Sequence, residues 1–149
     1  MFIAGTDTTS NALVQATYHA LSNPTIYDTL KRELGAAMPD LDEPILDWTA
    51  LEKLPYLRGV VKEALRFSYG VPGRVPRVVP SEGAILAGKR VPAGTSVAAS
   101  SYVYHVSDDV FPEARSFRPE RWLDENGGQE LESKLLSFSK GPRSCLGVK

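Results

Sequence analysis

The chain has a single cysteine, Cys145, in a segment whose residue types favour metal binding by its sulfur atom. Gly141 and Gly147 flank it, and Arg143 stands two residues before it. Glycines let backbone amides approach a sulfur atom closely, and amide hydrogen bonds and a nearby cation stabilise a thiolate over a thiol. A thiolate is a suitable ligand for a soft metal ion. An inert cysteine is the ordinary alternative for a single thiol, but the spacing of the flanking residues favours the ligand.

Two further segments have residue types that could do chemistry. Residues 4–9 read Ala-Gly-Thr-Asp-Thr-Thr, which alone predicts a helix cap, because glycine, aspartate and threonine are poor residues for a helix interior. Glu63 and Arg66 stand three apart on a predicted helix, on the side opposite its apolar stripe. Periodicity alone therefore predicts an exposed pair that contributes only about 0.2 to 0.5 kcal/mol and carries no function.

Four motifs, in the right order, resemble those of the cytochrome P-450 family, the haem-thiolate monooxygenases. Residues 138–147 fill every specified position of the family's haem-binding signature, Phe-x-x-Gly-x-Arg-x-Cys-x-Gly. Residues 4–9 resemble the oxygen-activation segment of its long helix, and residues 63–66 its Glu-x-x-Arg motif. Residues 119–122 read Pro-Glu-Arg-Trp and are similar to its Pro-Glu-Arg-Phe motif, with one aromatic residue in place of another. The similarity extends from Phe2 to Gly147.

This resemblance implies a haem cofactor, heme b, with Cys145 as the axial ligand of the iron. Arg143 would pair with a haem propionate, because a guanidinium matches a carboxylate in fork geometry. Phe138 would pack beside the thiolate, although an ordinary core phenylalanine is an equal alternative. By position Arg77 resembles the family's second propionate-binding arginine, with Arg74 as the alternative register. The complete set of cofactor-binding residues expected is Cys145, Arg143, Arg77, Phe138 and Gly141.

The resemblance also implies roles around the cofactor. Thr8 and Asp7 would take part in dioxygen activation and proton delivery, where the helical hydrogen-bond ladder would open locally. Ala4 would leave room beside the haem for dioxygen and substrate, and Val71 and Pro72 would contact the substrate.

A structural role is implied for three residues. Glu63, Arg66 and Arg121 would form a buried network that holds the haem-side core together and takes no part in the redox chemistry. His19 and His105 stand alone, without a ligand partner at metal spacing, and are expected to be structural.

The elements that must position these residues are predicted to be mainly α-helical with a small β-sheet. Asn23 and Pro24 are a cap and a first helical residue, and the spacing of Leu57, Val60 and Ala64 predicts an amphipathic helix. Ala87-Gly88 predicts a hairpin turn, with a further strand within residues 95–100. We expect a partial cytochrome P-450 domain over 1–149: an oxygen-activation helix 1–21, helices 24–37 and 55–68, a small sheet 74–100, an ordered loop region 107–137 and the cysteine loop 138–149.

Composition excludes several other classes of protein. The 149 residues carry a formal net charge of -1, so there is no overall basic field to hold a nucleic acid or an anionic membrane. No apolar run approaches the roughly 20 residues that span a bilayer, and the chain carries no targeting signal. One cysteine cannot form an internal disulfide, which fits a reducing compartment.

The resemblance implies a monooxygenase that inserts one oxygen atom of dioxygen into a small apolar organic substrate. The residues around Arg74 and Arg143 resemble those of fungal secondary-metabolism members, which implies an NADPH-dependent reductase as electron donor. It also implies the cytosolic face of the endoplasmic reticulum membrane, with an N-terminal anchor that is absent here. We expect an incomplete C-terminal, haem-binding part of the fold, inactive and unstable alone. The alternatives are a peroxide-rearranging member of the family and a non-catalytic product of a truncated gene.

Overall fold

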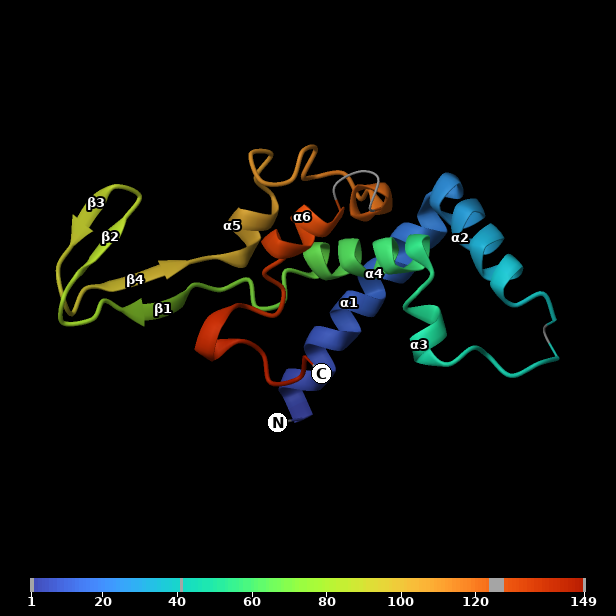
Figure 1. The fold of residues 1–149 in the computed structure, drawn as a ribbon, viewed down its shortest axis with the longest axis horizontal. Coiled ribbons are helices and arrows are strands. Elements are labelled where there is room, and N and C mark those ends of the chain that lie inside the picture. The colour runs from blue at the N-terminus through green and yellow to red at the C-terminus, as the bar shows by residue number, and fades with distance from the viewer. Residues whose placement is uncertain (1, 41, 124–127, 149) are drawn as a thin grey trace.

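Helices form most of the fold, and short strands form a separate arm (Figure 1). The computed structural model describes residues 2–40, 42–123 and 128–148. The parts of the expected elements at residues 1, 41, 124–127 and 149 lie outside the described residues. The helices are α1 (Phe2–Ser22), α2 (Pro24–Ala37), α3 (Trp48–Leu51), α4 (Pro55–Ser68), α5 (Ser101–His105) and α6 (Gly128–Lys134), with 3-10 turns η1 (Pro119–Trp122) and η3 (Gly141–Arg143). The predicted fold class, mainly α with a little β, is confirmed.

Helix α2 begins and ends where its sequence predicts. The Asn23 side chain accepts hydrogen bonds from the backbone N–H groups of Thr25 and Ile26, and Pro24 occupies the first turn, where its missing N–H costs nothing. On the buried face, Ile26 packs with Tyr56 and Val60 of α4. This cluster fixes α2 against α4.

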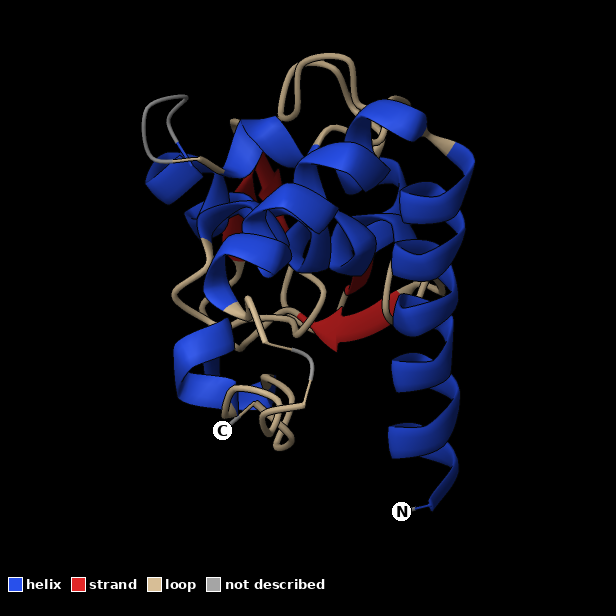
Figure 2. Ribbon diagram, turned by 90° about the vertical axis from the view of Figure 1, so that its right-hand side faces the viewer, coloured by secondary structure: helices blue, strands red, loops and turns tan. Residues whose placement is uncertain are grey.

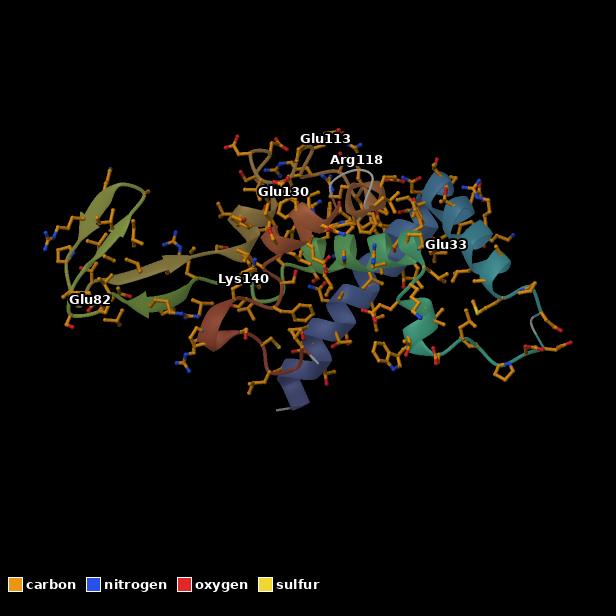
Figure 3. All side chains as sticks on the ribbon, in the orientation of Figure 1. Glu33, Glu82, Glu113, Arg118, Glu130 and Lys140 are labelled. Carbon is orange, nitrogen blue, oxygen red and sulfur yellow. The ribbon has the colours of Figure 1, made fainter. Side chains whose placement is uncertain are left out.

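The start of helix α4 is capped by a side chain from α2. Both carboxylate oxygens of Glu33 accept backbone N–H groups, one from Tyr56 and one from Leu57, each at 2.8 Å. A carboxylate at a helix N-terminus satisfies otherwise unpaired donors and complements the helix dipole. Figure 3 shows Glu33 beside the start of α4.

Helix α4 also approaches the η1 turn closely through Gly59. A Cβ at this position would lie 2.6 Å from the carbonyl oxygen of Pro119, so only glycine lets the two backbones come this near. The contact positions Arg121 of η1 beside the side chains of α4, and the site described below depends on it.

The strands form two separate two-stranded sheets in place of the single small sheet expected over 74–100. Strands β2 (Ala84–Leu86) and β3 (Lys89–Val91) form a hairpin, and positive φ angles at Ala87 (49°) and Gly88 (75°) make its tight turn. Strands β1 (Val75–Val78) and β4 (Ser96–Ala99) pair antiparallel, from Val75 opposite Ala99 to Val78 opposite Ser96. Pro80 and Pro92 lie between the two ladders and have no N–H to continue either one.

The segment expected as an ordered loop over 107–137 has its own small core. Phe111, Ala114 and Trp122 are buried together, and partly buried residues from α5 and α6 pack around them. The elements η1 and α6 are the short helical turns expected in this segment.

Helix α1 lies along one side of the molecule, and its N-terminal end extends beyond the other helices (Figure 2). Large apolar side chains on it are exposed, among them Leu13, Val14, Tyr18 and Leu21. Among the described residues, no helix has the length and apolar character needed to cross a bilayer.

Candidate functional site

A pocket of about 1310 Å³ lies between α1, the end of α4, the β1–β4 ladder and the cysteine loop. Small-molecule and cofactor pockets usually measure about 300 to 1,000 Å³, so this one has space for a cofactor together with a substrate. Six of the residues predicted from the sequence line it: Ala4, Thr8, Val71, Arg77, Phe138 and Cys145. Segments far apart in the sequence are thus brought to one cavity.

The remaining predicted residues do not line the pocket. Asp7, Pro72 and Gly141 are exposed residues next to lining ones, and Arg143 is an exposed residue two positions before Cys145. The three residues of the predicted structural triad are buried. Arg77 lines the pocket from β1, whereas the alternative arginine, Arg74, does not.

The cysteine loop presents the Cys145 thiol to the pocket. The backbone N–H of Cys145 donates to the carbonyl of Phe138 at 2.8 Å, which closes the loop on itself. Gly141 makes the turn with a φ of 75°, in the left-handed region that favours glycine. The N–H of Gly147 donates to the Cys145 sulfur at 3.4 Å, the kind of amide contact that stabilises a thiolate. Cys145 is therefore an exposed residue with a free thiol.

Helix α1 brings Thr8 to the opposite side of the pocket. Its hydroxyl donates to the carbonyl of Ala4 at 2.7 Å. The helix runs without a break from Phe2 to Ser22, so the local opening of the ladder expected here is not present. The threonine hydroxyl bonds one turn back along a regular helix instead, as threonine does in helix interiors.

A polar contact fixes α1 over the pocket. The Asn11 side chain donates to the carbonyl of Ser68, the last residue of α4, at 3.1 Å. The chain then turns through Tyr69, whose φ of 58° ends the helix. Sequence analysis missed Asn11, and its only signal was a polar side chain near the predicted oxygen-activation segment.

The wall formed by residues 69–72 is held by two serines at the start of α5. The Ser101 hydroxyl lies 2.8 Å from the carbonyl oxygen of Tyr69 and 3.0 Å from that of Val71. The Ser100 hydroxyl donates to the carbonyl of Pro72 at 2.6 Å. Pro72 therefore shapes the wall through its backbone, while Val71 itself lines the cavity.

Glu63 lies at the centre of a buried network beneath the pocket. Arg66 donates to it through Nε at 3.0 Å and Nη2 at 2.8 Å, and Arg121 donates through Nε at 3.1 Å. Glu63 and Arg66 are fully buried and Arg121 nearly so. The exposed pair predicted by periodicity alone is wrong, because η1 and the preceding segment cover this face of α4.

The two guanidinium groups also hold main-chain carbonyls. Arg66 Nη1 donates to the carbonyls of His105 at 2.6 Å and Ala114 at 2.7 Å, and Arg121 Nη1 donates to Pro112 at 2.7 Å. Burial lowers the pKa of Arg121, and the Glu63 carboxylate opposes that effect. Charged donors shared between a carboxylate and carbonyls tie α4 to the segment 105–116.

Trp122 belongs to the same network, and sequence analysis did not predict this. Its indole Nε1–H donates to Glu63 at 2.8 Å. The available signal was the tryptophan itself. A buried indole N–H requires a hydrogen-bond acceptor, whereas a phenylalanine ring has no N–H donor.

The two histidines have the structural surroundings expected of them. His19 stacks on Phe117 with ring centroids 4.2 Å apart, and His105 is fully buried. Within the described part of the chain, no group of three or more His, Cys, Asp or Glu side chains could hold a metal ion.

The residues of the pocket fit a haem. One thiol with an amide donor faces the cavity, the walls are mostly apolar, and Arg77 offers a guanidinium at one wall. A thiolate and an arginine are the donors that a haem iron and a propionate require.

Comparisons with known proteins agree with this geometry. The family model described as Cytochrome P-450 matches residues 1–149. The cytochrome P-450 monooxygenase MO6277 of Ascocoryne sarcoides is 45% identical over 146 residues, covering 97% of this chain and 28% of that protein. The cytochrome P-450 monooxygenase aneF of Aspergillus aculeatus is also 45% identical over 146 residues, covering 98% of this chain and 29% of its own length.

A solved structure supports the same assignment. The crystal structure of the cytochrome P-450 CYP102L1 superposes with a TM-score of 0.80 at 26% identity, over 98% of this chain and 33% of that one. The chain spans less than a third of the length of the curated relatives named above. By the match of its whole length to the family model, the chain belongs to the cytochrome P-450 family of haem-thiolate oxidoreductases.

Proposed function

We propose that the protein containing this chain is a haem-dependent monooxygenase. It inserts one oxygen atom of dioxygen into a small apolar organic molecule and reduces the other atom to water with two electrons and two protons. The observation that carries the proposal is that the Cys145 thiol and the Thr8 hydroxyl line one large, mostly apolar pocket. The fungal monooxygenases similar to this chain support it.

Cys145 would be the axial ligand of heme b, with its thiolate favoured by the Gly147 amide. Phe138 and the backbone turn at Gly141 would limit the access of water to the sulfur. Arg77, from the pocket wall, and Arg143, from η3, would pair with the propionates. When bound, the haem supplies the activation of dioxygen and its transfer to carbon.

Thr8 and Asp7 would pass protons from solvent to the cavity. The Thr8 hydroxyl can rotate away from the Ala4 carbonyl, to which it now donates, and donate into the pocket instead. Asp7 directly precedes Thr8 in α1, and its side chain is exposed to water. It would take up protons from the solvent. The two side chains would thus connect the solvent beside α1 with the apolar pocket.

The substrate would contact apolar side chains that line the pocket. Val71, Ala4 and Leu65 offer methyl groups and no charge, which favours a small apolar molecule. The relatives named above lead us to propose a fungal secondary metabolite as substrate.

Electrons would come from an NADPH-dependent reductase, at the cytosolic face of the endoplasmic reticulum membrane. This part of the proposal rests on the similarity to fungal monooxygenases.

The test uses the full-length protein encoded by the gene of this chain. The reduced protein with carbon monoxide should give the thiolate-type Soret band, and Cys145→Ser should abolish it. Thr8→Ala should keep the band and lower the product formed per NADPH consumed, and Ser10→Ala is the matched control on the same helix. A Cys145→Ser protein with unaltered pigment and oxidation contradicts the proposal.

Two other outcomes distinguish the alternatives. Turnover of an organic peroxide without NADPH, unaffected by Thr8→Ala, indicates a peroxide-rearranging enzyme. A wild-type protein that binds no haem indicates a non-catalytic product.

A further inference from the structure

His105 connects the buried Glu63 network to the segment that leads into the cysteine loop. It is the last residue of α5 and is fully buried. Its carbonyl accepts from Arg66 Nη1 at 2.6 Å, and its ring Nε2 accepts from the backbone N–H of Leu136 at 3.0 Å. His105 therefore contacts the Glu63 network through its carbonyl and the segment before the cysteine loop through its ring.

The ring is held in the form that can accept. Because Nε2 accepts the N–H of Leu136, the proton of the neutral imidazole lies on Nδ1. Burial, followed by the charge of Arg66, lowers the pKa of His105 to about 4. The ring packs edge-on against Phe111 at a centroid distance of 5.8 Å, which fixes its orientation.

Two main-chain hydrogen bonds link the segment after Leu136 to the backbone of Cys145. Ser139 N–H donates to the Leu136 carbonyl at 2.9 Å, and Cys145 N–H donates to the Phe138 carbonyl at 2.8 Å. These bonds connect the position of Leu136 to the backbone that carries the sulfur. The Ser137 hydroxyl, which donates to the Leu65 carbonyl at 2.8 Å, ties the same segment to α4.

We propose that His105 is a positioning residue, whose neutral ring fixes Leu136 and thereby sets where the Cys145 thiol meets its ligand. The same short helix holds the 69–72 wall through Ser100 and Ser101 at its other end. Helix α5 thus contacts both the segment that leads into the cysteine loop and the 69–72 wall of the same pocket. The proposal rests on the proposed function only in taking Cys145 as the haem ligand.

The test compares His105→Phe, which keeps an aromatic ring and removes the acceptor, with His105→Gln, whose side-chain oxygen can take the place of Nε2. In the haem-loaded full-length protein, His105→Phe should speed amide hydrogen exchange at Leu136 by about tenfold, because the buried N–H loses its partner. It should also convert part of the thiolate-type Soret band of the reduced carbon monoxide complex to the non-thiolate form. His105→Gln should keep the slow exchange at Leu136 and the thiolate-type Soret band of the wild type.

His19→Phe is the matched control. His19 stacks on Phe117, and among the described residues it has no hydrogen bond to the cysteine loop. Wild-type exchange and an unaltered band in His105→Phe overturn the proposal. If that variant does not accumulate, His105→Asn replaces it, because its oxygen lies at the Nδ1 position. Equal protection of Leu136 by Gln and Asn then overturns the proposal.

A failure of the haem assignment gives a different result. In that case the wild-type protein lacks the thiolate band, while exchange at Leu136 still depends on the residue at 105.

Discussion

The indole N–H of Trp122 donates to Oε2 of Glu63 at 2.8 Å, the same oxygen that accepts from Nε of Arg66 at 3.0 Å. Glu63 Oε1 accepts from Arg66 Nη2, from Arg121 Nε and from the Arg118 backbone N–H. The buried carboxylate thus has donors on both oxygens. A phenylalanine at position 122 would supply none, so the tryptophan adds a bond to the triad predicted from the sequence.

Trp122→Phe should lower the free energy of unfolding by about 2 to 3 kcal/mol, because a hydrogen bond to a buried charge is lost and the smaller ring leaves space. Denaturant unfolding of the full-length protein measures this. Trp48→Phe is the control, because Trp48 is 74% exposed and its replacement should change stability by no more than about 0.5 kcal/mol. Equal effects of the two substitutions would contradict the importance of the indole bond.

Glu63→Gln should cost about 3 to 5 kcal/mol, since it leaves the buried guanidinium groups of Arg66 and Arg121 without a carboxylate. The yield of haem-loaded protein and its unfolding midpoint should both fall. Glu132→Gln breaks the Lys62–Glu132 pair, in which the Glu132 side chain is 55% exposed, and should cost less than about 1 kcal/mol. A mild effect of Glu63→Gln would mean that the two arginines are satisfied by carbonyls alone.

Local signals predicted the elements whose causes are local. Asn23 and Pro24 begin α2 through contacts within three residues, and Ala87 and Gly88 turn the hairpin by their own φ angles. The burial of Glu63 could not be read this way, because its partners Arg121 and Trp122 lie 58 and 59 residues along the chain. Periodicity describes one helix, and this face of α4 is covered by another element.

The site shows a second limit of periodicity. Val61 stands four residues after Leu57 and so fits the apolar spacing predicted for α4, yet it is 47% exposed and lines the pocket. A wall of a cofactor pocket and a packed core require the same apolar side chains, so spacing alone does not separate them. The motif resemblance supplied the residues around the cavity, while the hydrogen bonds of Asn11, Ser101 and His105 required the structure.

Gly59→Ala should destabilise the protein by about 1 to 3 kcal/mol, because the new Cβ would meet the Pro119 carbonyl oxygen at 2.6 Å and push η1 away from α4. The matched change, Gly35→Ala in α2, meets no heavy atom within 4 Å. It should stabilise by about 0.5 to 1 kcal/mol through the better helix propensity of alanine. Thermal unfolding of both variants tests the opposite signs, and two shifts in the same direction would contradict the close approach.

His105 should make the protein less stable in mild acid. Its pKa is lowered from 6.5 to about 4 by burial first and then by Arg66, while Glu63 acts in the opposite direction. Between these two values the unfolded chain binds a proton that the folded chain does not, so stability decreases as the pH falls from 6.5 towards 4 and this contribution changes no further below that. The full loss is about 3 kcal/mol.

Carboxylates also titrate in this range, so the measurement is the difference between wild type and His105→Gln, which has no proton to bind. Urea unfolding at about pH 7 and about pH 4.5 should show the wild type losing more stability than the variant. The comparison is specific to this residue because the substitution removes the titrating ring and keeps an acceptor for the Leu136 N–H. Parallel losses in the two proteins would mean that the ring is already protonated when it is buried, and a protonated ring could not accept from Leu136.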